Sequence, residues 1–367
     1  MFRNACALSL LIVFAGVNPL PAANVQESAN SADGTGAGAY DENQESSGPD
    51  SHNTGAFEPS ELIMHHIADA NEFHIVGDLT LPLPCILFNR ETGAWSFFMS
   101  NRLYNRQHEP AEYDGYRMDH GRIKRTDDAA FLDLSITKNV FGMLMAALLM
   151  SVIFLGIARS YVSREGKAPK GMQSFLEPLI LFIRDDIVRP NIGPKYERYM
   201  PYLLTVFFFI WINNMLGLVP FFPGSANVTG NITVTMTLAV FTLIVTSVSG
   251  NKQYWQHVLW MPGVPAPVKL ILTPIELVGL ITKPFALMIR LFANITAGHI
   301  IILSLASLIF VFGKGGQSLG GGLGGSALAV PFMLFMNVLE LFVAFLQAFI
   351  FTILSALFIG QAVEEHH

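Results

Sequence analysis

The sequence is short of charged residues, cysteines and positive net charge, and each shortage excludes a class of protein. Only 14% of the 367 residues are charged, whereas a soluble protein of this size carries about a quarter. The formal net charge of −6 argues against nucleic acid as a partner. The two cysteines, Cys6 and Cys85, are too few for a disulfide framework, and we expect no bridge because Cys6 lies in a segment that is expected to be removed.

Long hydrophobic runs are abundant instead. Hydrophobic residues make up 51% of the chain, and several runs are long enough to span about 30 Å of hydrocarbon. The sequence therefore predicts an all-α polytopic membrane protein with five membrane-crossing helices, at about 139–157, 202–222, 232–249, 270–312 and 327–363. Polar residues in or beside the second and third runs are expected to make interhelical hydrogen bonds; they are Asn213, Asn214, Asn231, Thr233 and Thr235.

The N-terminal part has a different composition. Residues 1–23 have the positive start, short apolar run and small-residue end of a secretory signal peptide, with a retained membrane anchor as the alternative. Residues 24–56 lack large apolar side chains and are expected to be disordered. Residues 57–135 are expected to form a small extracytoplasmic region with strands such as Phe73–Val76 and Trp95–Met99. Three histidines there lack metal-ligand spacing, so we expect no metal site; they are His65, His66 and His74.

Residues 136–367 form the predicted membrane domain. The signal peptide places the N-terminal region outside, so five crossings leave the C-terminus in the cytoplasm. Residues 171–190 carry too many charges to cross the bilayer, and we expect an amphipathic helix in the membrane interface. A core helix packed against its neighbours is the alternative. The apolar face of this helix is expected to contain Phe175, Leu179, Phe182 and Ile183.

The last two apolar runs are too long to stand upright in a bilayer. As helices they would measure about 65 Å and about 55 Å, against about 30 Å of hydrocarbon. Each must therefore tilt strongly, kink or break. The glycine-rich segment 313–325 between them is expected to be a flexible turn.

Arg290 lies in the middle of an apolar stretch, Lys283–Leu303, with no acidic residue within ten positions. A guanidinium at bilayer depth costs at least about 2.5–3.5 kcal/mol, so Arg290 needs a negatively charged partner. Arginine stays protonated in proteins, and it can therefore attract and ionise a carboxylate without passing on a proton itself.

One line of polar residues runs back along the chain from Arg290. Glu276, Lys283 and Arg290 recur every seven residues, which keeps them on one side of a helix. A direct pair of Arg290 with Glu276 would have to cover about 21 Å along an unbroken helix. Glu276 and Lys283 could also simply extend toward the cytoplasmic interface.

A second line runs forward. Asn294 lies one helical turn beyond Arg290, and His299 lies about 13 Å along the axis. Glu340 and Gln347 are seven residues apart on the last helix, where they could face His299. His299 and Glu340 can bind and release protons, although Glu340 could instead pair with Arg290. Two polar routes that meet at a fixed cation predict two aqueous half-paths that do not join.

Several motifs in these segments resemble those of subunit a of the F-type ATP synthase, and the resemblance covers roughly residues 136–367. The most specific motif is Arg290-Leu291-Phe292-Ala293-Asn294 followed by Ala297-Gly298. The supporting motifs are Pro274-x-Glu276, Lys283-Pro284, Asn231-Ile232-Thr233 and Leu346–Phe351.

The resemblance implies a role for each polar residue. Arg290 matches the arginine that faces the ion-carrying carboxylates of the rotating c-ring. His299 and Glu340 match the positions that line the channel from the outer side. The remaining proton-path residues match polar neighbours of that channel and a position near the cytoplasmic exit; they are Asn294, Gln347 and Glu276.

The resemblance also implies an activity and partners. It implies a proton-translocating stator subunit whose two offset half-channels load and unload the c-ring carboxylates and so couple the ion gradient to rotation and ATP synthesis. The implied partners are the c-ring, the subunit b stalk and the lipid bilayer of a bacterial inner membrane, and Na⁺ remains open as the ion. The chain has no G-x-x-x-x-G-K-[ST] loop, so nucleotide chemistry is expected on partner subunits, with no cofactor here.

Two other functions compete with this one. A secondary transporter would show an internal repeat, whereas the two long segments share no motif. A purely structural membrane scaffold would leave Arg290, His299 and Glu340 without a physical reason.

Overall fold

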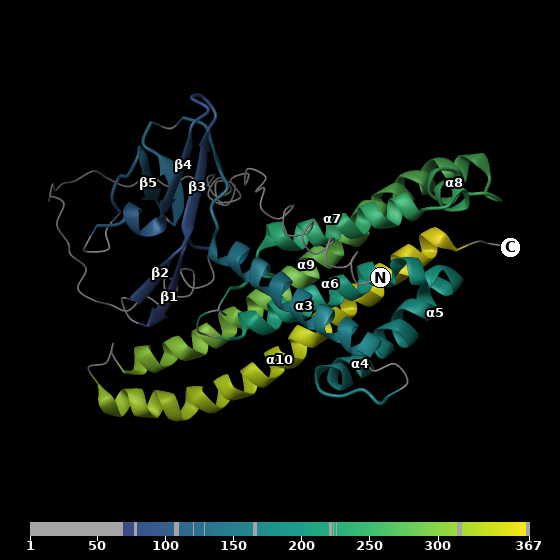
Figure 1. Ribbon diagram of the computed structural model, residues 1–367. Coiled ribbons are helices and arrows are strands. Elements are labelled where there is room, and N and C mark those ends of the chain that lie inside the picture. Colours follow the sequence, from purple (N-terminus) through teal and green to yellow (C-terminus); the bar gives the residue numbers. More distant parts are fainter. Residues whose placement is uncertain are drawn as a thin grey trace, which may run out of the picture.

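The computed structural model describes residues 69–364, apart from 77–78, 106–109, 120, 128, 164–166, 220–221, 223, 225 and 314–317. It has a strand-rich N-terminal part and a helical part, and Figure 1 shows the strands at one end of the helices, beside the start of α3(Lys138–Ser163). The predicted signal peptide, the predicted disordered segment, and Cys6, His65 and His66 lie outside the described residues.

The N-terminal part, residues 69–137, is called the cap below. Its described residues form small antiparallel sheets: β1(Glu72–Val76) pairs with β2(Leu79–Pro82), β3(Pro84–Asn89) lies between β4(Trp95–Met99) and β7(Phe131–Asp133), and β5(Tyr116–Asp119) pairs with β6(Arg122–Arg125). A short 3-10 helix, η1(Ser100–Leu103), follows β4. The strands predicted at 73–76 and 95–99 are confirmed as β1 and β4.

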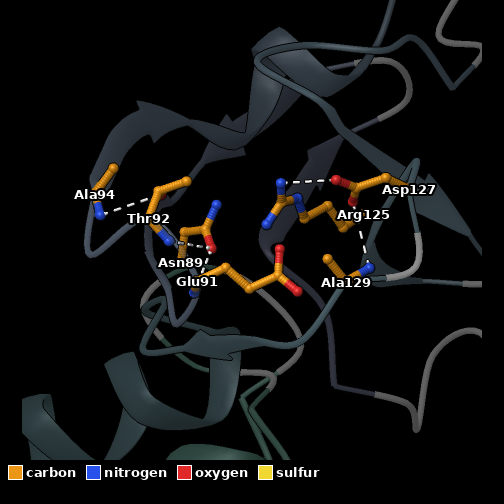
Figure 2. Close-up of polar contacts among 7 residues, drawn as sticks. All are labelled: Asn89, Glu91, Thr92, Ala94, Arg125, Asp127 and Ala129. Carbon is orange, nitrogen blue, oxygen red and sulfur yellow. Dashed lines mark hydrogen bonds and ion pairs between the residues drawn. The ribbon is translucent and has the colours of Figure 1, made fainter.

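Side-chain hydrogen bonds hold the turns of the cap. After β3, the Asn89 Oδ1 atom accepts hydrogen bonds from the backbone N–H groups of Glu91 at 2.9 Å and Thr92 at 3.3 Å, as Figure 2 shows. After β6, Arg125 pairs with Asp127 at 2.7 Å. Asp127 Oδ1 also accepts from the Ala129 N–H at 3.3 Å, and side-chain-to-backbone bonds of this kind are the usual way in which Asn and Asp fix turns.

The helical part contains the elements that could cross a membrane. After α3 come α4(Met172–Phe182), the π-helical η2(Ile183–Val188), α5(Arg189–Ile192), η3(Gly193–Lys195), α6(Tyr196–Gly217), α7(Ile232–Ser249), α8(Lys252–Trp260), α9(Ala266–Phe312) and α10(Leu319–Val363). Among the described residues, five helical segments are long and apolar enough to span a bilayer: Lys138–Ser163, Met172–Gly217, Ile232–Ser249, Pro267–Phe312 and Leu319–Val363. The prediction of a mostly helical, polytopic membrane protein is confirmed.

The hydrophobic core of the helical part forms around α6. Residues Phe207–Ile210 are buried on every side of this helix, as expected of a helix that is apolar all round. Phe208 contacts Phe154 of α3 with ring centroids 4.8 Å apart, and Phe207 contacts Phe345 of α10 at 5.7 Å. α6 ends at Gly217 rather than at the predicted residue 222, because Pro220 follows and the residue before a proline is held out of the helical region.

α9 and α10 are continuous helices of 47 and 45 residues that pack against each other. In Figure 1 they form the two longest ribbons. Neither helix breaks, so of the three predicted ways to fit about 70 Å of helix into a bilayer, a strong tilt and a kink are left.

The glycine-rich turn is shorter than predicted, because α10 begins at Leu319 rather than near residue 327. Ser318 caps this end of α10, where its Oγ accepts a hydrogen bond from the Gly321 N–H at 3.2 Å. At Gly325 a Cβ atom would lie 3.1 Å from the Phe312 side chain. The close approach of α9 to α10 thus uses these glycines, and the packing offsets their low helix propensity of about 1 kcal/mol each.

Residues 172–192 are helical, as predicted. Of the predicted apolar face, Ile183 is buried in the core and Leu179 and Phe182 pack against it, whereas Phe175 is 69% exposed. The charged Asp185 and Asp186 are exposed, as the amphipathic pattern requires. This burial favours the alternative interpretation, a core helix packed against its neighbours. The position of this helix at the membrane interface remains a prediction.

Cys85 is expected to be chemically inert in the folded protein. It is fully buried, and burial raises the pKa of its thiol to about 12, whereas the thiolate is the reactive form. In a Cys6→Ser variant, maleimide should leave Cys85 unlabelled in native membranes at neutral pH and label it after denaturation in detergent. A control that moves the sole cysteine to the exposed Thr92 should react readily. Equal labelling rates at the two positions would contradict the buried placement of Cys85.

Candidate functional site

The structure brings His299 of α9 and Glu340 of α10 together. The His299 Nδ1 atom lies 2.7 Å from Glu340 Oε1 and 3.2 Å from the carbonyl oxygen of Ile295. Glu340 is only 5% exposed. An imidazole and a carboxyl group can each carry a proton, and this distance brings the two groups within reach of one another.

A small polar cavity lies against the His299–Glu340 pair. Its walls come from α6, the α6–α7 loop, α9 and α10, and they include Asn213, Asn214, Gly217, Ala226, Asn227 and Thr229. Three buried wall atoms have no hydrogen-bond partner in the described part of the chain: Asn213 Oδ1, Asn227 Nδ2 and Glu340 Oε1. Buried polar groups of this kind are normally satisfied by water. The cavity therefore suits water molecules that reach the pair.

Asn214 holds this cavity together. Its Nδ2 donates to the Ala344 carbonyl of α10 at 3.2 Å, and its Oδ1 accepts from the Thr229 hydroxyl of the α6–α7 loop at 2.6 Å. Asn214 thus makes the predicted interhelical bond. The adjacent asparagines in an apolar run were predicted from the sequence to make interhelical hydrogen bonds, but the sequence indicated neither the cavity nor the contact with Thr229.

The prediction of interhelical bonds is wrong for three of the other polar residues. The Asn213 amide donates to Phe209 in its own helix, Asn231 caps the start of α7 by accepting from the Thr233 N–H, and the Thr235 hydroxyl donates to the Ile232 carbonyl. Asn and Thr side chains bond readily to nearby backbone, and here this local bonding prevails over bonds between helices.

A second polar group lies on the other side of Arg290 along α9. The Lys283 Nζ atom donates to Gln361 Oε1 of α10 at 3.4 Å. A small cavity beside Lys283 is lined in part by Thr246 and Tyr254. Lys283 and His299 are sixteen residues apart in one helix, or about 24 Å, so the two polar groups are separate.

Glu276 belongs to the same end of the molecule as Lys283. Burial raises the pKa of the Tyr254 hydroxyl, and the negative charge of nearby Glu276 raises it further. Glu276 itself is half-buried. The polar residues near Glu276 and Lys283 therefore include Tyr254 and Gln361, which the sequence alone did not single out.

Arg290 is exposed and makes no hydrogen bond or ion pair with any residue in the described part of the chain. The alternative pairs with Glu276 and Glu340 are therefore absent, and Glu340 is engaged by His299. Asn294 is also exposed, whereas Gln347 is buried at 3% exposure. The exposed residues that share the face of α9 with Arg290 are mostly small and apolar, namely Ala286, Ala293 and Ala297, with Asn294 beside them.

Comparison with known proteins gives two family matches and many relatives. Residues 140–360 match the family described as ATP synthase A chain, and residues 62–139 match a family described as a domain of unknown function. The chain is 48% identical over 240 residues to ATP synthase subunit a of Chloroherpeton thalassium, covering 64% of this chain and 69% of that relative. It is 48% identical over 241 residues to ATP synthase subunit a 2 of Chlorobaculum tepidum, covering 64% of this chain and 65% of that relative.

Gly298 is expected to be required for the His299–Glu340 pair. A Cβ atom at this position would lie 2.8 Å from Glu340 Oε1, and Glu340 could move away only by giving up its contact with His299. Gly298→Ala should therefore destabilise the protein by about 1–3 kcal/mol, measured as a lower midpoint of thermal unfolding in detergent. Gly279→Ala is the matched control, because Gly279 lies in the same helix with nothing within 4 Å of its Cβ position. Equal midpoints for the two variants would contradict this role.

Proposed function

This chain belongs to the family of ATP synthase A chains, and on that premise we propose that it is the stator subunit through which protons cross the membrane sector of an F-type ATP synthase. It is a multi-pass membrane protein. The proposal rests above all on one observation: Arg290 is a permanent cation without an internal partner, on an apolar surface between two separate polar groups.

The unmatched charge of Arg290 supports a partner outside the chain. The face of α9 around it is uncovered and largely apolar, because Ala286, Ala293 and Ala297, which share this face, are exposed. We take this face to receive the c-ring, whose carboxylates pass Arg290 in turn. The guanidinium stabilises the ionised carboxylate, so a carboxylate that arrives protonated releases its proton there.

The outer half-channel ends at His299 and Glu340. A proton from outside reaches the pair through the polar cavity, and the pair passes it to a c-ring carboxylate near Asn294 and Gln347. The neutral carboxylate can then travel through lipid, because its charge and hence its desolvation cost are gone. The membrane potential contributes about 2.3 kcal/mol per charge per 100 mV to this step.

The inner half-channel begins near Lys283 and leads past Glu276 to the cytoplasm. Proton flow between the two half-channels must pass through a full turn of the ring, because Arg290 cannot hand on a proton. This arrangement requires the N-terminal cap outside, the C-terminus in the cytoplasm, and a b-type stalk that keeps the chain from turning with the ring. Nucleotide chemistry lies on other subunits.

Arg290→Ala is expected to reduce ATP-driven proton pumping in inverted membrane vesicles at least about tenfold, or about 1.4 kcal/mol, because the rotor carboxylate would no longer be ionised at the boundary between the half-channels. The amount of assembled complex should be unchanged. Lys252→Ala, which removes an exposed cation from α8, is the control and should pump normally. Normal pumping by an assembled Arg290→Ala complex would refute the proposed role.

The His299–Glu340 pair is expected to tolerate an exchange better than a loss. The double variant His299→Glu, Glu340→His keeps an imidazole beside a carboxyl group, so it should retain more ATP-driven pumping than His299→Ala or Glu340→Ala. Pumping would be compared at equal amounts of assembled complex. An exchange variant as inactive as both single variants would count against a shared proton.

A further inference from the structure

The cap is joined to the membrane part by a short, buried contact. Asp69 Oδ1 accepts a hydrogen bond from the backbone N–H of Asn139 in the first turn of α3 at 3.1 Å, and the Lys138 N–H donates to the Ala70 carbonyl at 2.8 Å. A carboxylate at the N-terminus of a helix is also favoured by the helix dipole. The start of β1 is therefore fixed to the outer end of α3.

Phe73 extends this contact to a third element. It is 1% exposed, and its ring meets Phe141 of α3 at a centroid distance of 5.3 Å and Phe222 of the α6–α7 loop at 5.6 Å. Phe141 and Phe222 are 5.7 Å apart, so the three rings touch one another. We call these three residues the ring cluster. It ties the cap, the first membrane helix and the loop together, and edge-to-face contacts like the two of Phe73 are favourable beyond simple burial.

The α6–α7 loop, which the ring cluster holds, also forms part of the wall of the polar cavity beside His299 and Glu340. Beyond Phe222 it runs through Ala226–Thr229, which are almost fully buried and line the cavity beside His299 and Glu340. α3 approaches it so closely that a Cβ at Gly142 would lie 2.9 Å from the Ala226 Cβ. Thr229 at its far end bonds to Asn214. The loop is thus pinned at the Phe222 end by the cap and at the Thr229 end by α6.

We propose that the cap, which matches a family without a known function, is a positioning element for the outer proton path: Phe73 holds the α6–α7 loop so that Ala226–Thr229 close the cavity around the His299–Glu340 pair. This inference rests on the proposed function of that pair. The cap does not touch the proton. It limits how much water reaches the pair.

A looser loop would change the electrostatics of the pair in a defined way. With one shared proton the pair is net neutral, while loss of that proton or gain of a second leaves a net charge. Extra water stabilises both net-charged states, so the range of pH over which the pair holds one proton becomes narrower. Loss of the Phe73 side chain should therefore change the shape of the pH profile of activity. A general loss of folded protein would lower the activity by the same factor at every pH.

The experiment measures ATP synthesis by the complete complex in vesicles, as a function of the pH on the outer side, at equal amounts of assembled complex. For Phe73→Ala we expect the active pH range to narrow by at least about one unit. Phe97→Ala is the matched control: Phe97 is an aromatic residue of the cap that is 68% exposed, and its removal should leave the profile unchanged. Phe73→Leu, which keeps an apolar side chain at this point, should lie between the two.

A second variant keeps the test decisive if Phe73→Ala does not assemble. Phe222→Ala removes the loop side of the ring cluster, where the ring is 37% exposed, and it should narrow the profile in the same way. Assembled Phe222→Ala with a wild-type profile would overturn the inference. His299→Gln distinguishes failure of this inference from failure of the proposed function. If the pH profile changes in His299→Gln but not in the cap variants, only the role of the cap is overturned. If the pH profile of His299→Gln is that of the wild type, the outer proton path itself is overturned.

Discussion

The charge of Arg290 constrains the rest of this protein more than any other feature. A guanidinium in apolar surroundings is costly unless a negative charge meets it, and no carboxylate in the described part of the chain does so. Glu340 contacts His299. Glu276 lies fourteen residues before Arg290, about 21 Å along the helix, and near Tyr254. This unmatched charge is the reason for proposing a partner that brings carboxylates to the uncovered face of α9.

The helices are arranged so that this face stays open while the other side is closed. α6 is buried on all sides and supports both α3 and α10. α10 packs against α6, α9 packs against α10, and both long helices remain unbroken through Pro274, Pro284 and Pro331. A rigid hairpin of this kind keeps Arg290, the His299–Glu340 pair and Lys283 at constant separations along one element. Constant separations along the helix keep the two proposed half-paths from connecting.

The cap gives the outer end a support that the membrane helices alone do not provide. The α6–α7 loop has few intrinsic constraints, since much of it is Gly, Ser, Asn and Pro, and such segments are mobile unless they are tied down. Here the tie is the ring cluster, together with the bond between Asn214 and Thr229. The polar wall of the outer cavity is therefore built from parts that are distant in the chain.

The sequence by itself determined the membrane class, the five spanning segments and the apolar sequence neighbourhood of Arg290, because these depend on local composition and on the fixed rise and turn of a helix. It also indicated the stripes of polar residues that contain Glu276, Lys283, His299, Glu340 and Gln347. Only the tertiary structure decided that His299 meets Glu340, that Asn214 reaches Thr229 and Ala344, and that Asn213, Asn231 and Thr235 bond locally. These contacts depend on how far apart and in which register two helices pack. That is settled by the glycines at their interface, such as Gly298 and Gly325, and by side chains many residues away in the chain.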